Sequence, residues 1–302
     1  MTTTTTLYAV VHGAQRALAE AGITSAAADA AELAAFALGV DRAEVQRLMI
    51  LRQPADPAFV DRFDALVAER CERIPLQHLT GRAYFRELTL AVGPGVFVPR
   101  PETELAAGLA IDAARRCIDE GVAEPVVIDL CTGSGAIALA VKDEVPTARV
   151  RGVELSDLAH GWAVANQAST GLDVELTCGD ATTAYAELAG TVDVVVSNPP
   201  YIPDGMVPVD PEVRDHDPSV ALYGGSTDGL AIPLAVARNA ARLLRPGGVF
   251  VMEHADTQGV SLPEGLRAAG HWLDVLDHKD LNDRPRAVSA VRTSEGPPTG
   301  SR

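Results

Sequence analysis

Apolar side chains recur at helical spacing along the first 75 residues. Leu7, Val11 and Leu18 are four and seven residues apart, which places them on one face of a helix. Short polar side chains stand where three further helices would begin: Ser25, Asp41 and Asp56. The last of them precedes a proline, which is favoured at the first helical position. The pattern predicts four short helices, typical of a small bundle, over residues 1–75.

The pattern changes after this region. Glycines, prolines and a polar–apolar alternation at 87–92 predict a hairpin and linker over residues 76–105. Short apolar runs then alternate with helical segments, and we expect strands at 126–130, 150–155, 174–177, 192–197, 248–252, 272–276 and 287–291. This alternation predicts a doubly wound α/β domain over residues 106–293. Gly, Pro and Ser dominate residues 294–302, where we expect a disordered tail.

Composition excludes several classes of protein. The chain has 302 residues and a net charge of −16, which argues against nucleic acid as the main partner. Apolar residues make up 47% and charged residues 22%, as in ordinary globular proteins. The sequence shows neither an apolar run long enough to span a bilayer nor a secretory signal. Because the four cysteines are widely spaced, we expect reduced thiols in a cytoplasmic protein with no metal site.

A glycine-containing loop follows the first strand of the α/β pattern. Its candidate ligand-binding residues are Asp129, Cys131, Thr132, Gly133, Ser134 and Gly135. In doubly wound sheets ligands bind beyond the carboxyl ends of the strands, and glycines let the backbone approach them closely. The third glycine of a dinucleotide-binding loop is missing, and the leading acid would repel a pyrophosphate but suits a cationic ligand. Glu154 and Asp180 end the next two strands, where carboxylates can bind ribose hydroxyls and an adenine amino group. Together these features favour S-adenosylmethionine (SAM) over NAD.

A rigid turn, Asn198-Pro199-Pro200-Tyr201, follows the fourth strand. Its two prolines fix φ and remove two backbone donors. The Asn198 side-chain oxygen and the Pro199 carbonyl can then accept both protons of one planar –NH2 group, while Tyr201 supplies a flat wall. These hydrogen bonds concentrate charge on a poorly nucleophilic nitrogen. The turn therefore predicts methylation of an amide or an exocyclic amine, driven by positioning and electrostatics.

These residues together resemble the N(5)-glutamine methyltransferases of peptide chain release factors (the HemK/PrmC family). The motifs that carry the resemblance are Pro75–Gly81, Phe97–Glu104, Asp129–Gly135, Val192–Pro203, Arg214–Pro218, Ala221–Gly225, Asp228–Gly229 and Leu244–Gly248, leading to Glu253. DNA and RNA amino-methyltransferases share the Asn-Pro-Pro-Tyr turn. The segment Val98–Glu104 is far more specific to the release factor family.

The resemblance implies a helical N-terminal domain that docks the release factor, a hairpin linker and a seven-stranded SAM-dependent methyltransferase domain. The implied acceptor is the glutamine of the Gly-Gly-Gln loop of class 1 release factors, and the product is S-adenosylhomocysteine. The implied cofactor-binding residues are Asp129, Cys131, Thr132, Gly133, Ser134, Gly135, Glu154, Asp180, Ala181 and Asn198. The implied catalytic residues are Asn198, Pro199 and Tyr201, and together with Pro200 they would also bind the substrate. Arg100 and Glu102 would close the site or, alternatively, form an ion pair in the linker.

The chain departs from the family pattern at two positions. Cys131 stands where the family often has glycine, and a thiol is tolerable there if φ is negative. Ala181 stands where many members have an aromatic residue, so adenine would have to pack elsewhere, with Leu155 as a candidate. Two alternative functions remain at this point. One is an adenine N6-type nucleic-acid amino-methyltransferase, which would need a basic surface; the other is a non-catalytic SAM-binding docking protein. We expect a monomer.

Overall fold

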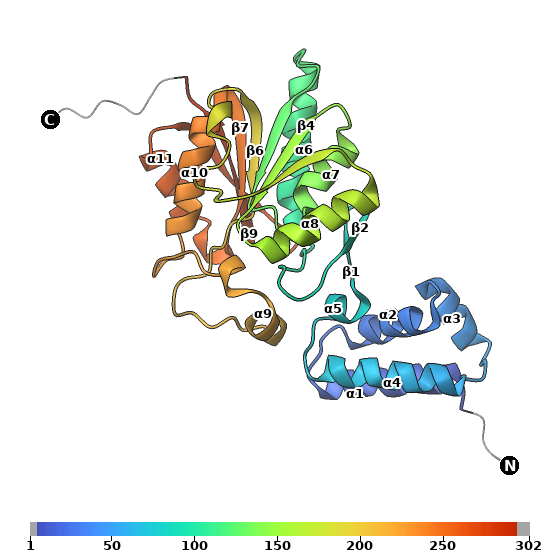
Figure 1. Ribbon diagram of the computed structural model, residues 1–302. Coiled ribbons are helices and arrows are strands. Elements are labelled where there is room, and N and C mark those ends of the chain that lie inside the picture. The colour runs from blue at the N-terminus through green and yellow to red at the C-terminus, as the bar shows by residue number, and fades with distance from the viewer. Residues whose placement is uncertain (1–4, 295–302) are drawn as a thin grey trace. The chain divides into compact units, whose positions relative to one another are not determined.

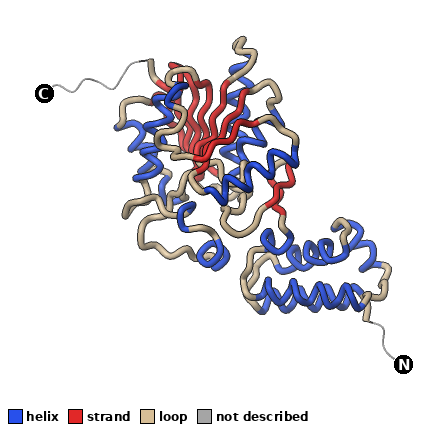
Figure 2. Tube along the Cα trace, viewed as in Figure 1, coloured by secondary structure: helices blue, strands red, loops and turns tan. Residues whose placement is uncertain are grey.

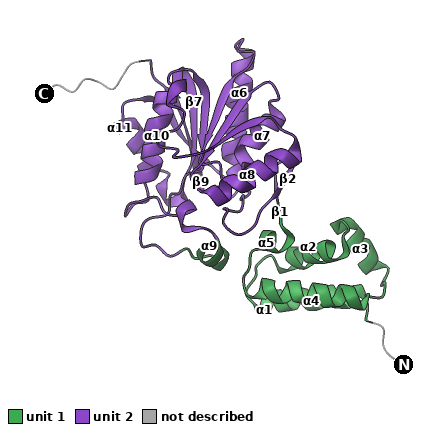
Figure 3. Ribbon diagram, viewed as in Figure 1, with its two compact units in different colours: residues 1–82, 208–216 green, residues 83–207, 217–302 purple. Residues whose placement is uncertain are grey.

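The computed structural model describes residues 5–294, which divide into two compact units (Figure 3). Among the described residues, one unit comprises 5–82 and 208–216, and the other comprises 83–207 and 217–294. The first is therefore assembled from two stretches that are far apart in the sequence. The tail expected at residues 294–302 lies, from residue 295 onward, outside the described residues.

The first unit is helical. Its helices are α1 (Leu7–Glu20), α2 (Ala26–Leu38), α3 (Arg42–Ile50), α4 (Pro57–Cys71), α5 (Leu76–Thr80) and α9 (Pro211–His216). The helices predicted before residue 76 are confirmed, and the Asp41 and Asp56 side chains cap α3 and α4 as expected. Ser25 precedes α2, but its side chain makes no capping hydrogen bond. Phe59 and Phe63 stack in the core of the bundle, with ring centroids 5.3 Å apart.

The second unit is built on a twisted sheet. Within residues 83–294, seven strands form it in the order β5-β4-β3-β6-β7-β9-β8. Their bounds are β3 (Val126–Leu130), β4 (Arg149–Glu154), β5 (Val174–Cys178), β6 (Val192–Ser197), β7 (Leu244–Glu253), β8 (Trp272–Lys279) and β9 (Pro285–Arg292). Strands β3 to β7 pair in parallel, whereas β9 runs antiparallel to both neighbours. Figure 2 shows the strands gathered side by side with helices around them. The predicted α/β fold is confirmed. Ahead of the sheet, β1 (Arg82–Phe85) and β2 (Leu88–Ala91) form the expected hairpin.

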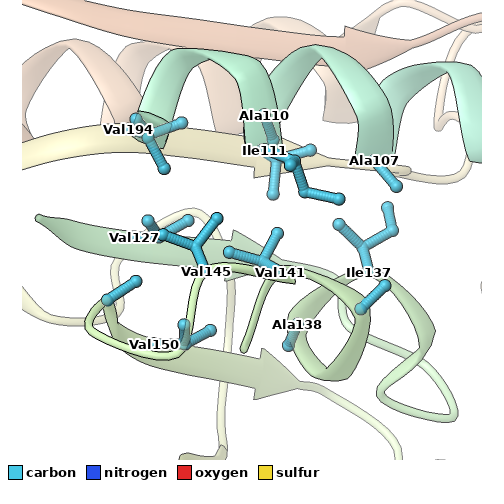
Figure 4. Packing of buried hydrophobic residues seen from close by; sticks show 14 of the residues in the cluster. Ala107, Ala110, Ile111, Val127, Ile137, Ala138, Val141, Val145, Val150 and Val194 are labelled. Atoms are coloured by element: carbon cyan, nitrogen blue, oxygen red, sulfur yellow. The ribbon is translucent and has the colours of Figure 1, made fainter. Parts of the chain in front are cut away.

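Helices pack on both faces of this sheet (Figure 1). They are α6 (Thr103–Asp119), α7 (Ala136–Glu144), α8 (Asp157–Thr170), α10 (Ala231–Leu243) and α11 (Ser261–Ala268). Val127 and Val194 pack against α6 and α7 (Figure 4), while the next residues along the strands, Ile128 and Val195, belong to the core that contains α10 and α11. This alternation buries both faces, which explains the continuous apolar runs of the strands. No helix among the described residues is both long and apolar enough to cross a bilayer.

The strand order places the two sequence motifs side by side. The chain runs outward from β3 through β4 to β5 and then returns to pair β6 with the other side of β3. Leu130 at the end of β3 is paired with Ser197 at the end of β6. The glycine-containing loop and the Asn-Pro-Pro-Tyr turn thus leave neighbouring strands at the point where the strand order reverses. In open α/β sheets this is the usual ligand-binding edge.

Candidate active site

Glu154 holds the glycine-containing loop from the neighbouring strand. Its Oε2 accepts from the backbone N–H of Gly133 at 2.8 Å, and its Oε1 accepts from that of Ser156 at 2.9 Å. The loop also bonds to β4 through its backbone, because the Thr132 N–H donates to the Val153 carbonyl at 2.9 Å. The structure therefore brings together Glu154 and the loop, which the sequence predicted separately. A carboxylate can accept further hydrogen bonds, so Glu154 retains capacity for ribose hydroxyls.

Asp129 supports this loop from inside the protein. It is fully buried, and its Oδ2 accepts from the Thr132 hydroxyl at 2.6 Å and from the Ala138 N–H at 3.1 Å. Burial raises the pKa of Asp129 to about 7, although these two hydrogen bonds oppose the shift. From the sequence, we expect this acid to attract a cationic ligand. Its burial corrects that expectation, since the side chain binds the loop itself.

The backbone of the loop enters the left-handed region at Cys131 (φ +69°) and at Gly133 (φ +57°). The condition of a negative φ at Cys131 is therefore not met, which explains why glycine suits this position. For a residue with a side chain this conformation costs about 1–2 kcal/mol. Burial raises the pKa of the Cys131 thiol, so the group stays protonated. Apart from its two chain neighbours, no described residue has a heavy atom within 4 Å of a Cβ built on Gly133, which leaves open space beside the loop.

The end of β5 carries the third predicted acid. Asp180 Oδ1 accepts from the Thr182 N–H at 2.8 Å and from its hydroxyl at 2.7 Å. The neighbouring Ala181 is buried, and its carbonyl accepts from the Asn239 amide at 2.8 Å. Leu155, directly after β4, is 58% exposed. An apolar side chain thus lies uncovered next to Glu154.

Asn198 is oriented by the start of α6. Its Nδ2 donates to the Thr103 hydroxyl at 3.3 Å. Because the amide nitrogen is used in this way, Oδ1 is the atom of Asn198 that can accept from a substrate. The Thr103 N–H in turn donates to the Arg100 carbonyl at 3.1 Å. The segment before α6 is thereby attached to the turn after β6.

Tyr201 is held at both its hydroxyl and its carbonyl. The hydroxyl donates to Glu253 Oε1 at 3.1 Å. The carbonyl accepts from Gln258 Nε2 at 2.9 Å, and the same nitrogen donates to the Asp228 carbonyl at 2.9 Å. Gly229 lies against the Tyr201 carbonyl so closely that a Cβ there would collide with it. The turn is therefore supported by three segments that are distant from it in sequence.

Glu253 is a buried acid behind the acceptor turn. It is 2% exposed, and burial raises its pKa to about 7 despite opposing hydrogen bonds from Thr103 and Tyr201 and the nearby charge of Arg286. Burial also raises the pKa of Tyr201, so its hydroxyl remains a donor.

Three residues that support the turn were not predicted as site residues from the sequence. They are Thr103, Glu253 and Gln258. An acid at the end of the apolar strand β7 was the signal that could have revealed Glu253.

Arg100 and Glu102 are not joined to each other. Arg100 Nη2 donates to Asp217 Oδ2 at 2.8 Å, and its guanidinium lies 5.2 Å from the centre of the Phe97 ring. Glu102 stands at the N-cap position of α6 without a capping hydrogen bond. The alternative of a linker ion pair between them is therefore wrong, because the acid that binds Arg100 is Asp217.

Comparison with known proteins assigns the family. Residues 9–81 match the family model "PrmC N-terminal domain", and residues 93–209 match "Methyltransferase small domain". A release factor glutamine methyltransferase of Streptomyces coelicolor is 53% identical, covering 94% of this chain and 97% of that protein. The chain belongs to the release factor glutamine methyltransferase family. The corresponding protein of Mycolicibacterium smegmatis is 46% identical over 95% of this chain and 98% of its own length.

Membership in this family confirms the resemblance drawn from the motifs, and the protein is a SAM-dependent methyltransferase. One relative carries a different name. A 4-amino-L-phenylalanine/4-methylamino-L-phenylalanine methyltransferase of Streptomyces pristinaespiralis is 42% identical and covers 91% of each chain. Relatives with more than 40% identity to this chain are therefore named for different methyl acceptors. Among residues 5–294, no group of three or more His, Cys, Asp or Glu side chains is arranged to hold a metal ion.

Proposed function

We propose that this protein transfers the methyl group of SAM to the side-chain amide nitrogen of the glutamine in the Gly-Gly-Gln loop of class 1 release factors, leaving S-adenosylhomocysteine. The orientation of Asn198 is the observation that carries the proposal: Thr103 binds its nitrogen and so leaves its oxygen for the acceptor. The family names of the relatives from S. coelicolor and M. smegmatis support the same acceptor.

The cofactor binds in this proposal along the loop from Cys131 to Gly135. Glu154 accepts hydrogen bonds from the ribose, and Asp180 accepts from the adenine amino group. The open space beside Gly133 and the rigid placement of Glu154 support this assignment. Leu155 and Ala181 supply apolar contacts to the adenine. SAM contributes a methyl group bound to a sulfonium, which is the electrophile.

The acceptor turn raises the reactivity of an amide that is otherwise a weak nucleophile. Asn198 Oδ1 and the Pro199 carbonyl accept the two protons of the glutamine –NH2, which aims the nitrogen at the methyl group. Pro200 keeps the turn rigid, and the Tyr201 ring forms a wall beside the amide. The nitrogen becomes acidic as the C–N bond forms and then loses a proton, so a strong base is unnecessary. The surrounding dipoles, fixed in advance, stabilise the charge that develops.

The rest of the proposal concerns partners. The helical unit docks the release factor, and Arg100 and Glu102 lie at the edge of the acceptor site. The protein acts as a monomer in the cytoplasm, where release factors work, without a metal, a membrane or direct nucleic-acid binding. The net charge of −16 supports the proposal that the protein does not bind nucleic acid directly.

Peptide mass spectrometry tests this function. Purified, unmethylated release factor is incubated with the protein and SAM, and a single methyl group is expected on the glutamine of the Gly-Gly-Gln loop. A release factor with asparagine in place of that glutamine serves as the control and should gain none. If the release factor gains no methyl group although calorimetry shows SAM binding, the proposed substrate is wrong. Methylation of 4-amino-L-phenylalanine in a parallel reaction would then identify an arylamine as the acceptor.

A further inference from the structure

Residues 208–216, which include α9, belong to the helical unit, although the chain on either side belongs to the methyltransferase unit (Figure 3). This stretch, here called the α9 segment, follows the acceptor turn after a short connection. The chain therefore passes from the acceptor turn into the helical unit and back again.

Glu212 fixes the α9 segment in a buried network of charges. Its Oε1 lies 2.7 Å from Arg70 Nη1, and its Oε2 lies 2.6 Å from Arg73 Nη2. Arg70 Nε also binds Asp29 Oδ2 at 2.8 Å. The side chains of Asp29, Arg70 and Glu212 are all less than a tenth exposed. Removing one member of such a network leaves a buried charge without its partner, which is strongly unfavourable.

The charge of Glu212 is maintained by its hydrogen bonds. Burial acts to raise the pKa of Glu212, but its hydrogen bonds, among them those from the Arg73 and Arg70 guanidiniums, outweigh this effect and lower the pKa to about 2. The carboxylate is therefore ionised at neutral pH. Asp210 also accepts from the Glu212 N–H at 3.1 Å, which starts the α9 helix.

A second ion pair fixes the chain directly after the α9 segment. Asp217, whose side chain is fully buried, binds Arg100 at 2.8 Å inside the methyltransferase unit. The Arg100 carbonyl accepts from Thr103, and the Thr103 hydroxyl accepts from Asn198. Asp217 thus lies five positions after Glu212. Glu212 is held by the helical unit, and Asp217 is connected through this path to the acceptor asparagine.

The returning chain is also fixed to the acceptor turn. The Ile202 N–H donates to the Leu222 carbonyl at 2.8 Å, and the Gly224 N–H donates back to the Ile202 carbonyl at 2.9 Å. The chain that leads into the α9 segment and the chain that returns from it are therefore hydrogen-bonded to each other next to Tyr201. Because these connections are short and fixed at both ends, a displacement of the α9 segment moves the acceptor turn, whereas a long free loop would absorb it.

We propose that Glu212 is a positioning residue that couples docking of the protein substrate on the helical unit to the placement of the acceptor turn. The inference rests on the proposed function, in which the helical unit docks the release factor. Glu212 does not touch the acceptor or SAM; it acts through the α9 segment, Asp217 and Arg100. Its loss should therefore weaken the use of a whole release factor more than the use of a short peptide that needs no docking.

The test compares Glu212→Gln with Asp215→Asn in the full-length protein. Asp215 lies on the same helix, but its side chain is 46% exposed and pairs with Arg214 at the surface, so the control removes a similar charge without breaking the buried network. For Glu212→Gln, KM for the release factor should rise at least about tenfold. SAM affinity should stay within about twofold, and the use of a short Gly-Gly-Gln peptide should be weakened less than the use of the release factor. Asp215→Asn should match the wild type in all three.

Hydrogen exchange followed by mass spectrometry supplies a readout that needs no substrate. Coupling predicts faster exchange in Glu212→Gln both in the α9 segment and at the backbone amides of Ile202 and Gly224. Faster exchange confined to residues 208–216, with KM unchanged, would overturn the proposal and leave Glu212 a purely local role. If Glu212→Gln does not fold, Arg73→Met removes one contact of Glu212 and keeps the Arg70–Asp29 pair; it should change both readouts in the same direction by a smaller amount.

The two proposals fail in different ways. If the wild type does not methylate the release factor, the proposed function is wrong, and the exchange measurement alone decides whether Glu212 is coupled to the acceptor turn. If the wild type methylates the release factor but the Glu212 and Asp215 variants have equal KM and equal exchange, the function stands and the coupling is wrong.

Discussion

The cofactor side and the acceptor side of the site are built in different ways. On the cofactor side, the glycine-containing loop is supported by residues at the ends of adjacent strands, Asp129 and Glu154, which bind its backbone and side chains. On the acceptor side, the turn is supported by Thr103, Glu253 and Gln258, which come from segments far away in the sequence. The first arrangement is nearly local, whereas the second exists only in the folded domain. Substitutions should therefore impair the two sides separately.

The largest effect is expected from Gly229→Ala on the acceptor side. A Cβ at this position would collide with the Tyr201 carbonyl and displace the turn. Turnover should fall at least about 100-fold, because a displacement near 1 Å has this cost for a positioned reactant. Gly205→Ala is the matched control, since Gly205 has a similar positive φ but no heavy atom within 4 Å of a Cβ built there. Equal losses of turnover in both variants would attribute the effect to backbone strain. Calorimetry should show unchanged SAM affinity in each.

The converse substitution, Gly133→Val, should act on the cofactor side. It places a branched side chain in the open space beside the loop, at a φ of +57°. The Kd for SAM, measured by titration calorimetry, should rise by about tenfold or more, equivalent to about 1.4 kcal/mol. Gly190→Val also adds a side chain to open space at positive φ, but far from the loop in sequence. If both variants bind SAM with normal affinity, the assignment of the loop is wrong.

Asn198→Ala should have a smaller effect. It should lower turnover about tenfold, which corresponds to a loss of about 1.4 kcal/mol of transition-state stabilisation. SAM binding should be largely retained, because the loss concerns an acceptor of the substrate –NH2. Thr103→Val should lower turnover less, since it leaves Asn198 in place and removes the hydroxyl that orients it and also bonds to Glu253. Thr103→Ser should restore turnover. Unchanged turnover in Asn198→Ala, measured in single-turnover reactions, would contradict its role.

Glu253→Gln should affect turnover least, because the new amide oxygen still accepts from the Tyr201 hydroxyl. It should instead change how stability depends on pH. The pKa of Glu253 is about 7 in the folded protein, above its ordinary value, so between about pH 4.5 and about pH 7 the unfolded chain loses this proton while the folded protein keeps it. The wild type should therefore lose stability as pH rises through this window, by about 1–3 kcal/mol from this group.

Urea unfolding at about pH 5 and about pH 8 measures this difference. Glu253→Gln should show a smaller decline in the free energy of unfolding than the wild type. Part of the decline remains in the variant because burial also raises the pKa of Asp129. The same decline in both proteins would show that Glu253 titrates normally.

The fold could be predicted where periodicity is local. The buried strands and the bundle helices follow from apolar spacing, and the two motifs follow from glycine and proline at strand ends. Helices α5, α6, α9 and α11 were not predicted, and α5 lies where the hairpin and linker were expected. Alanine, whose small apolar side chain gives a weak periodic signal, is frequent in α6, and α9 is only six residues long. Its buried Glu212 lies in a polar stretch that is indistinguishable from a loop without its tertiary partners.

The candidate site could be predicted only in part, for the same reason. Glycines, acids and the Asn-Pro-Pro-Tyr turn are visible because each is defined by its immediate neighbours. The positive φ of Cys131 depends on how Thr132 and Gly133 are bound by Val153 and Glu154, which requires the paired strands. Likewise, nothing in the sequence around Gln258 indicates that its amide joins the carbonyls of Tyr201 and Asp228.

The route of the chain through residues 208–216 also sets an order for folding during synthesis. Helices α1 to α5 leave the ribosome first, and domains generally fold in the order in which they are made. Arg70, however, meets Glu212 only when residue 212 of 302 has been synthesised, after strands β3 to β6. The bundle is thus completed by a segment made long after its other helices. A fragment that stops at residue 82 would retain Asp29 and Arg70 but lack the carboxylate that completes their network.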